Sequence, residues 1–163
     1  MKEWCSLLAK DQDDTGSGAF LLLFNEEGFL ALQRRSANKD LFPEKWTVSA
    51  SGHIKQGETA REAIIRETRE EIGIELDAPK YIGAFSRTKP SLFFDPIHPA
   101  GTAHVFLAHI SNDSSFEIDP EEVQEIQWFK VYEISALHDK TPSVDQCLAF
   151  MVEQLRRREM LEE

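Results

Sequence analysis

Residues 52–74 read GHIKQGETAREAIIRETREEIGI, a stretch that is rich in glutamate and has glycines near both ends. Side chains three and four positions apart share one face of a helix. Glu67, Glu70 and Glu71 therefore fall together, next to a mainly apolar stripe. The stripe consists of Ile64, Ile65, Thr68 and Ile72. The segment predicts a helix whose carboxylate face is separate from its core face.

Both ends of this helix are marked in the sequence. Thr59 and Glu62 have the spacing of a capping box, so Thr59 is the expected N-cap. Gly73 suits the left-handed position that follows a last helical turn. We expect a tight loop between Gly52 and Gly57 to lead into the helix.

Three carboxylates on one helix face repel one another, and each like-charge pair costs ~0.2–0.5 kcal/mol. A divalent cation would remove this repulsion. Mg²⁺ prefers hard oxygen ligands and is commonly held by one or two carboxylates together with substrate phosphates. The pattern predicts a metal site for a phosphate-bearing ligand, in preference to a solvated acidic helix without a ligand.

The spacing from Gly52 through Glu58 to Arg66-Glu67-Thr68-x-Glu70-Glu71-x-Gly73-Ile74 resembles the Nudix box of the Nudix hydrolases. All charged and glycine positions match, and only Thr68 departs, since an aliphatic residue is usual there. The resemblance implies an α/β fold, a Nudix-type α/β/α sandwich with a mixed β-sheet. It implies one such domain over residues 1–163, with 1–17 as a candidate peripheral strand.

The resemblance also implies roles for individual residues. The catalytic residues it indicates are Glu67, Glu70, Arg66 and Glu58, with Arg66 and Glu58 forming an ion pair that orients the loop. The general base is Glu67 or a glutamate outside the box. The metal ligands it indicates are Gly52, through its carbonyl, with Glu67, Glu70, Glu71 and Glu122. The cofactor is Mg²⁺, with Mn²⁺ as the alternative ion.

Three of the candidate residues lie outside the box. Glu122, six positions before Trp128, is chosen as the outside glutamate, and a solvated acidic loop is the competing interpretation. Arg34 and Arg35 end a predicted strand, and the planar guanidinium suits phosphate recognition. A pair of surface arginines explains them equally well.

A second resemblance lies upstream, where residues 23–53 are similar to the N-terminal half of isopentenyl-diphosphate isomerases, a branch of the Nudix fold. Those enzymes place an essential cysteine directly before Gly-His, where this chain has Ser51. They also carry a metal-binding histidine where this chain has Ser17, and of that pattern only His53 is kept. With the box intact, the chain resembles an isomerase-like Nudix hydrolase.

The remaining elements follow from apolar patterning and turn residues. Strands are expected over 19–24, 29–34, 46–50, 81–87, 102–110 and 126–131. A short helix is expected over 132–138, and a final helix begins at Pro142. The loops 36–45 and 89–101 are where we expect substrate specificity to be set.

Composition limits the partners. The formal net charge of −11 disfavours binding to long nucleic acids, which depends on Lys and Arg contacts to phosphates. The longest apolar run, 19–24, is too short to span a membrane. Two cysteines and no leader-like start indicate a cytoplasmic protein. Its partner is then a small diphosphate substrate, and a homodimer is the assembly common among relatives.

The leading hypothesis is a Mg²⁺-dependent hydrolase that cleaves a diphosphate linkage in a nucleoside di- or triphosphate or another nucleoside diphosphate derivative. One alternative is an isopentenyl-diphosphate isomerase, which Ser51 argues against. The other is a non-catalytic nucleotide-binding module, which the intact carboxylates argue against.

Overall fold

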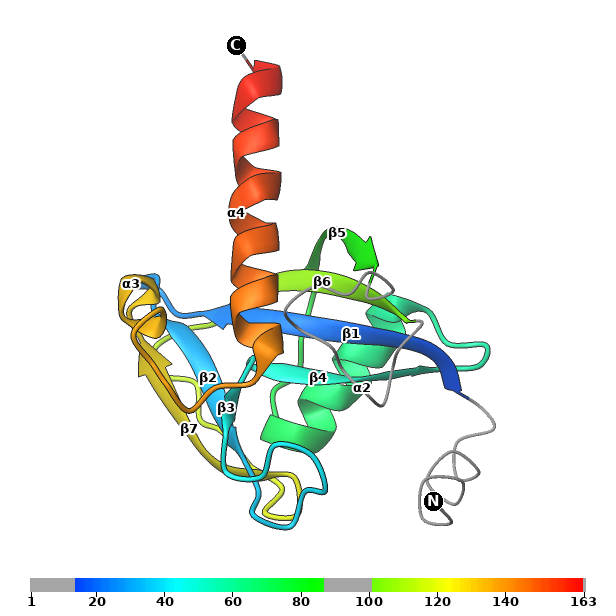
Figure 1. Cartoon of the computed structure of the whole chain (residues 1–163), viewed down its shortest axis with the longest axis vertical. Coiled ribbons are helices and arrows are strands. Elements are labelled where there is room, and N and C mark those ends of the chain that lie inside the picture. The colour runs from blue at the N-terminus through cyan, green and yellow to red at the C-terminus, as the bar shows by residue number, and fades with distance from the viewer. Residues whose placement is uncertain (1–13, 87–100, 163) are drawn as a thin grey trace.

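The computed structural model describes residues 14–86 and 101–162, and Figure 1 shows the path of the chain. Seven strands form one sheet: β1 (Asp14–Phe24), β2 (Leu30–Arg35), β3 (Trp46–Thr47), β4 (Ala50–Lys55), β5 (Lys80–Ser86), β6 (Thr102–His109) and β7 (Val123–Phe129). The helices are α2 (Ala60–Ile72), α3 (Val131–Ile134) and α4 (Pro142–Glu162).

The sheet is organised around β1, which lies at its centre. Strands follow the order β3-β2-β1-β6-β5, while β4 also pairs with β1 and β7 also pairs with β2. β1 and β6 run parallel, with Gly18 opposite Ala103. The other pairings are antiparallel, so the sheet is mixed as the sequence predicts.

Alternation along β1 separates two apolar layers, because successive side chains of a strand point to opposite faces. Leu22 and its neighbours two positions away pack with Val144 and Met151 of α4. Leu21 and its neighbours pack with Ile64 and Ile72 of α2. With α2 on one face and α4 on the other, the expected α/β/α sandwich is confirmed (Figure 1).

Four features of the strands differ from the prediction. The segment entering the box is a strand rather than a tight loop: β4 runs from Ala50 to Lys55 and pairs with β1, Gly52 lying opposite Ala19. The predicted strand 46–50 is divided into β3 and β4. β1 begins at Asp14 and therefore includes residues 14–17. β7 begins at Val123, three residues before the predicted start at 126, because it pairs along the whole of β2.

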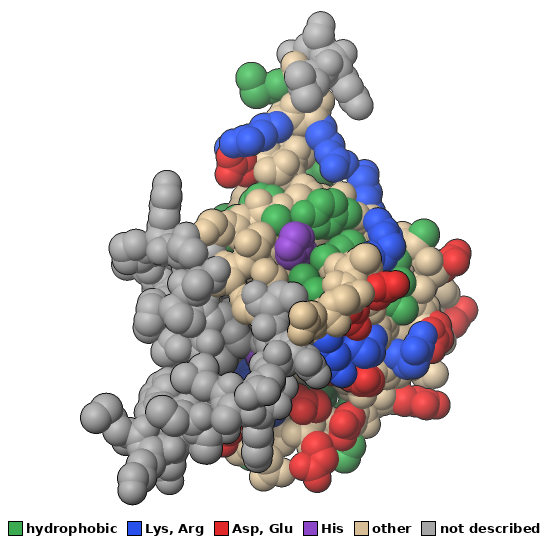
Figure 2. All heavy atoms as spheres, turned by 90° about the vertical axis from the view of Figure 1, so that its right-hand side faces the viewer, with side chains coloured by type: hydrophobic (Ala, Val, Ile, Leu, Met, Phe, Trp, Pro, Cys, Tyr) green, Lys and Arg blue, Asp and Glu red, His purple; other side chains and the backbone are tan. Residues whose placement is uncertain are grey.

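The last turns of α4 extend past the sheet (Figure 1), and Leu155 and Met160 are exposed there. On the face in Figure 2, hydrophobic side chains gather around a histidine, with Lys, Arg, Asp and Glu side chains mixed along the border. Within the described ranges, each helix is too short or too polar to cross a membrane. Most of the expected specificity segment 89–101 lies outside the described residues.

Candidate active site

Helix α2 carries most of the candidate residues, and its ends are fixed by the predicted caps. Thr59 Oγ1 accepts a hydrogen bond from the Glu62 amide at 3.1 Å, and the Glu62 carboxylate accepts one from the Thr59 amide at 2.8 Å. Gly73 adopts φ 70° and its amide donates to the Arg69 carbonyl. The capping box and the glycine C-cap are therefore confirmed.

Gly52 lies directly beneath the Glu67 side chain. A Cβ built on Gly52 would lie 2.1 Å from the Glu67 carboxyl carbon, which is closer than atoms can approach. The absence of a side chain at position 52 therefore leaves the space that Glu67 occupies. Burial raises the pKa of Glu67, and its hydrogen bond from Arg66 opposes that effect.

The Arg66 side chain connects helix α2 to β4 and to the loop that follows β4. Its Nε donates to Glu58 Oε1 at 2.7 Å, and its Nη2 donates to Glu58 Oε2 and to the His53 carbonyl, both at 3.1 Å. Its Nη1 donates to Glu67 Oε1 at 2.6 Å and to Glu70 Oε2 at 3.3 Å. Hydrogen bonding to Arg66 holds the pKa of Glu58 below its usual value. The predicted Arg66–Glu58 ion pair is present in the structure.

The Glu71 side chain is buried, whereas the Glu70 side chain is more than half exposed. Glu71 Oε2 accepts from Gln33 Nε2 and Glu71 Oε1 accepts from the Ser51 amide, both at 2.9 Å. Burial raises the pKa of Glu71 to about 8, against the opposing effect of these two hydrogen bonds. The prediction of a carboxylate face separate from the core is therefore wrong for Glu71, which lies on the side of α2 that meets β2 and β4.

The donor set fits a hard divalent cation. Three carboxylates and the Gly52 carbonyl are the oxygen ligands that Mg²⁺ prefers. In the part of the chain that the structure describes, no three His, Cys, Asp or Glu side chains are already gathered at metal-binding separation. The Arg66 guanidinium instead lies against Glu67 and Glu70 and supplies positive charge between them.

Arg34 and Arg35, the candidate phosphate-binding residues, form hydrogen bonds to the loop between β2 and β3. Arg34 Nε donates to the Glu44 carbonyl and Arg35 Nε donates to the Leu41 carbonyl, both at 3.0 Å. Arg34 also lies 3.6 Å from the carboxylate of Glu125 on β7. Phe42 and Glu44 in this loop both have positive φ, which is uncommon for residues with side chains. Phosphate binding by Arg34 and Arg35 stays a prediction.

Glu122 is the candidate metal ligand from outside the Nudix box, and it lies near Glu71. Its charge contributes to the raised pKa of Glu71, and its carboxylate forms an ion pair with Lys39. Its backbone carbonyl accepts a hydrogen bond from the Ser36 amide at 2.9 Å. The structure thus places the ion pair of Glu122 and Lys39 near Glu71. Metal binding by Glu122 stays a prediction.

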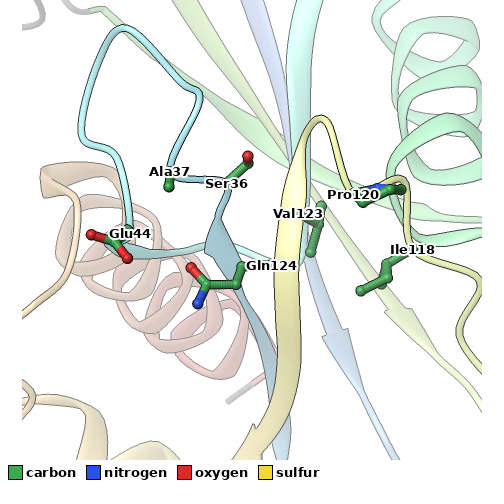
Figure 3. Close-up of a pocket in the computed structure, with 7 residues that line it drawn as sticks. All are labelled: Ser36, Ala37, Glu44, Ile118, Pro120, Val123 and Gln124. Atoms are coloured by element: carbon green, nitrogen blue, oxygen red, sulfur yellow. The ribbon is translucent and has the colours of Figure 1, made fainter.

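An open pocket of about 300 Å³ lies between the β2–β3 loop and the segment that leads into β7 (Figure 3). Ala37 and Glu44 line it on the loop side, and Ile118, Pro120 and Gln124 line it on the other. The loop 36–45, where specificity was expected, therefore forms one wall of a concave surface next to Glu122.

Two residues near the site were not predicted from the sequence. Gln33 follows three buried apolar residues in β2 and contacts Glu71, and Lys39 contacts Glu122. A polar residue in a buried strand is a signal that could have identified Gln33. Lys39 lies in a polar loop, where a single lysine gives no signal.

Comparisons with known proteins agree with this arrangement. The family profile described as NUDIX domain matches residues 14–149. An isopentenyl-diphosphate Delta-isomerase of Salmonella heidelberg (strain SL476) is 38% identical over 113 residues, which cover 65% of this chain and 57% of the relative. The chain thus spans little more than half the length of the curated relatives it matches.

Two solved structures share the fold. DR0079 from Deinococcus radiodurans is 25% identical with a TM-score of 0.65, covering 80% of this chain and 82% of that one. The Ap4A hydrolase of C. elegans, solved as a binary complex, is 21% identical with a TM-score of 0.63, covering 86% of this chain and 97% of that one.

Proposed function

Because the chain belongs to the Nudix family, we propose that it is a divalent-cation-dependent hydrolase that cleaves a diphosphate linkage in a nucleoside di- or triphosphate or a related nucleoside diphosphate derivative. The observation that carries the proposal is the placement of three α2 carboxylates at β4: Glu67 lies over Gly52, Glu71 accepts from the Ser51 amide, and Glu70 pairs with Arg66. It combines hard oxygen donors with a space that only glycine leaves open.

The cation would be held by Glu67, Glu70, Glu71 and the Gly52 carbonyl, with Glu122 as a further candidate. Such a cation, Mg²⁺ or Mn²⁺, would neutralise phosphate oxygens and help to orient an attacking water. Arg66 holds the strand that carries Gly52 in place through Glu58 and the His53 carbonyl. The chain would thereby hold the oxygen ligands through which a cation-bound diphosphate is positioned.

In the proposed reaction, the oxygen of water attacks one phosphorus of the diphosphate. The bond from that phosphorus to the bridging oxygen breaks, and the bridging oxygen leaves with the other phosphate. We assign acceptance of the water proton to Glu67, the carboxylate that lies over Gly52. Arg34 and Arg35, at the end of β2, are proposed to contact phosphate oxygens.

A release assay for phosphate products, with and without Mg²⁺, tests this proposal over nucleoside di- and triphosphates, sugar nucleotides, dinucleotides and prenyl diphosphates. We expect turnover that needs the cation and that falls by at least about 10²-fold in Glu70→Gln and Glu71→Gln, both still folded. Glu75→Gln is the matched control, because Glu75 is an exposed glutamate just beyond α2 that pairs with Arg69. Variant rates equal to the parent rate would refute the site assignment.

Isomerase activity is the second candidate function, because the curated relative at 38% identity carries that name. The residue at issue is Ser51, whose amide donates to Glu71 and which therefore lies beside the proposed metal site. A hydroxyl is a poorer proton donor to carbon than the thiol that the isomerase pattern requires. We expect incubation with isopentenyl diphosphate to give no dimethylallyl diphosphate, and its appearance would favour the isomerase.

A further inference from the structure

Gln33 is a polar side chain that follows the buried apolar residues 30–32 of β2, and it is only 2% exposed. A buried amide costs free energy unless its hydrogen bonds are made. Gln33 Nε2 donates to the Ser49 carbonyl at 3.2 Å and to Glu71 Oε2 at 2.9 Å. The amide therefore connects β2 both to the segment before β4 and to the helix that carries the candidate metal ligands.

Glu71 is held by two donors that come from two different strands. Gln33 on β2 binds one carboxylate oxygen and the Ser51 amide on β4 binds the other. An ionised carboxylate has roughly four acceptor positions. With one position on each oxygen taken, the plane of the carboxylate is fixed and the remaining positions are left for another partner.

We propose that Gln33 is a positioning residue that sets the cation affinity of the site by fixing the Glu71 carboxylate. The inference rests on the proposed function in one respect, namely that Glu71 binds the cation. Outer partners that orient a metal ligand commonly change metal affinity by about 10–100-fold when they are removed. Gln33 contributes no ligand atom in this proposal and acts only through Glu71.

The opposing explanation is that Gln33 only joins β2 to Ser49 and fills the core. Gln33→Met separates the two, because methionine has nearly the same length and volume but cannot donate a hydrogen bond. Gln127→Met is the matched control: Gln127 is an exposed residue of β7 that lies opposite Leu32, next to Gln33 in the sheet. Thermal unfolding in a chelator reports whether each variant is folded without metal.

The test is direct titration with Mn²⁺ alone, following the free ion by electron paramagnetic resonance. We expect Gln33→Met to bind Mn²⁺ about 10–100-fold more weakly than the parent, and Gln127→Met to bind it equally well. A Gln33→Met affinity within about twofold of the parent would overturn the inference. It would leave the proposed function standing, provided that Glu71→Gln loses binding. A parent protein that binds no cation would overturn both.

A second measurement needs no variant and therefore holds even if Gln33→Met fails to fold. The side-chain amide of Gln33 is observed by ¹⁵N NMR in the parent protein during titration with Mg²⁺. We expect its two amide protons to shift as the cation binds, because the carboxylate that accepts one of them gains a new partner. The side-chain amide of Gln127 is expected not to shift. An unchanged Gln33 amide at saturating Mg²⁺ would contradict the proposal.

Discussion

Gly52 has no side chain, and Glu67 occupies the space where one would lie. The glycine is needed there for contact rather than for backbone freedom, since Gly52 lies in a paired strand opposite Ala19. Arg66, the neighbour of Glu67 on α2, holds the same strand through the His53 carbonyl. The geometry of the site therefore depends on two residues: Gly52, which has no side chain, and Arg66, whose guanidinium holds the strand.

Gly52→Ala should separate activity from stability. The atoms that a new methyl group would meet are Cδ, Oε1 and Cγ of the Glu67 side chain, which would have to turn away. We expect turnover to fall about 10²-fold, since small misplacements of catalytic groups have effects of that size. The free energy of unfolding should change by no more than about 1 kcal/mol. Steady-state kinetics and urea unfolding check the two parts, and a fully active alanine variant would contradict the assigned role of Glu67.

Helix α2 ends at a position that needs glycine for two separate reasons. Gly73 has φ 70°, and a Cβ there would lie 2.6 Å from Glu117 Cβ and 2.8 Å from the Glu117 carbonyl oxygen. The Glu117 amide donates to the Ile72 carbonyl, so this neighbour is tied to the helix end and cannot move away. The cap thereby fixes the segment that leads to Glu122 and β7.

Comparing two alanine variants separates backbone strain from this overlap. Gly57 also has positive φ, 81°, but a Cβ there would meet nothing within 4 Å. Gly57→Ala should therefore cost only the left-handed strain of about 1–2 kcal/mol. Gly73→Ala should cost about 1–3 kcal/mol more, because it also overpacks against Glu117. Urea unfolding of both variants gives the difference, and equal losses would show that the overlap relaxes freely.

The β2–β3 loop forms a wall of the open pocket beside Glu122, and this placement leads to a prediction about substrate binding. Ala37 lines the pocket, whereas Asn38 next to it does not. We expect Ala37→Trp to fill the pocket and raise KM about tenfold or more with kcat little changed, since it removes binding remote from the reacting bond. Asn38→Trp should leave KM unchanged. An unaltered KM in Ala37→Trp would place the rest of the substrate elsewhere.

At the scale of the whole molecule, β1 is the strand on which both layers depend. Leu21 and Leu22 are fully buried and face opposite helices. The helices α2 and α4 pack against different faces of the sheet, and the site lies on the α2 face. Damage to either apolar layer should therefore destabilise the whole chain rather than the site alone.

Leu21→Ala and Leu22→Ala should each lower the free energy of unfolding by about 2–5 kcal/mol, since each leaves a cavity in a packed layer. Leu155→Ala, on the extension of α4 past the sheet, should change it by about 0.5 kcal/mol or less. Chemical denaturation measures all three. A loss confined to one of the two β1 variants would show that the layers do not unfold together.

Much of this architecture could be predicted from local sequence patterns. The α2 caps depend on Thr59, Glu62 and Gly73, whose spacing is visible in one segment. The central strand β1 has an uninterrupted apolar run over 19–24, and the mixed sheet agrees with the family resemblance. The early start of β7 and the strand character of residues 50–55 could not be predicted, because both depend on pairing with distant strands.

That Glu67, Glu70 and Glu71 lie on one helix could be predicted from their spacing alone, because helical spacing is a local property. The difference in burial between them arises from the packing of α2 against the sheet. Glu70 and Glu71 are separated by about 100° around the helix axis, and the sheet meets α2 on the side of Glu71. Glu70 thus stays in solvent while Glu71 is buried against Gln33 and the Ser51 amide. A spacing pattern gives angles around a helix, but the angle that faces the core is set by the elements that pack against it.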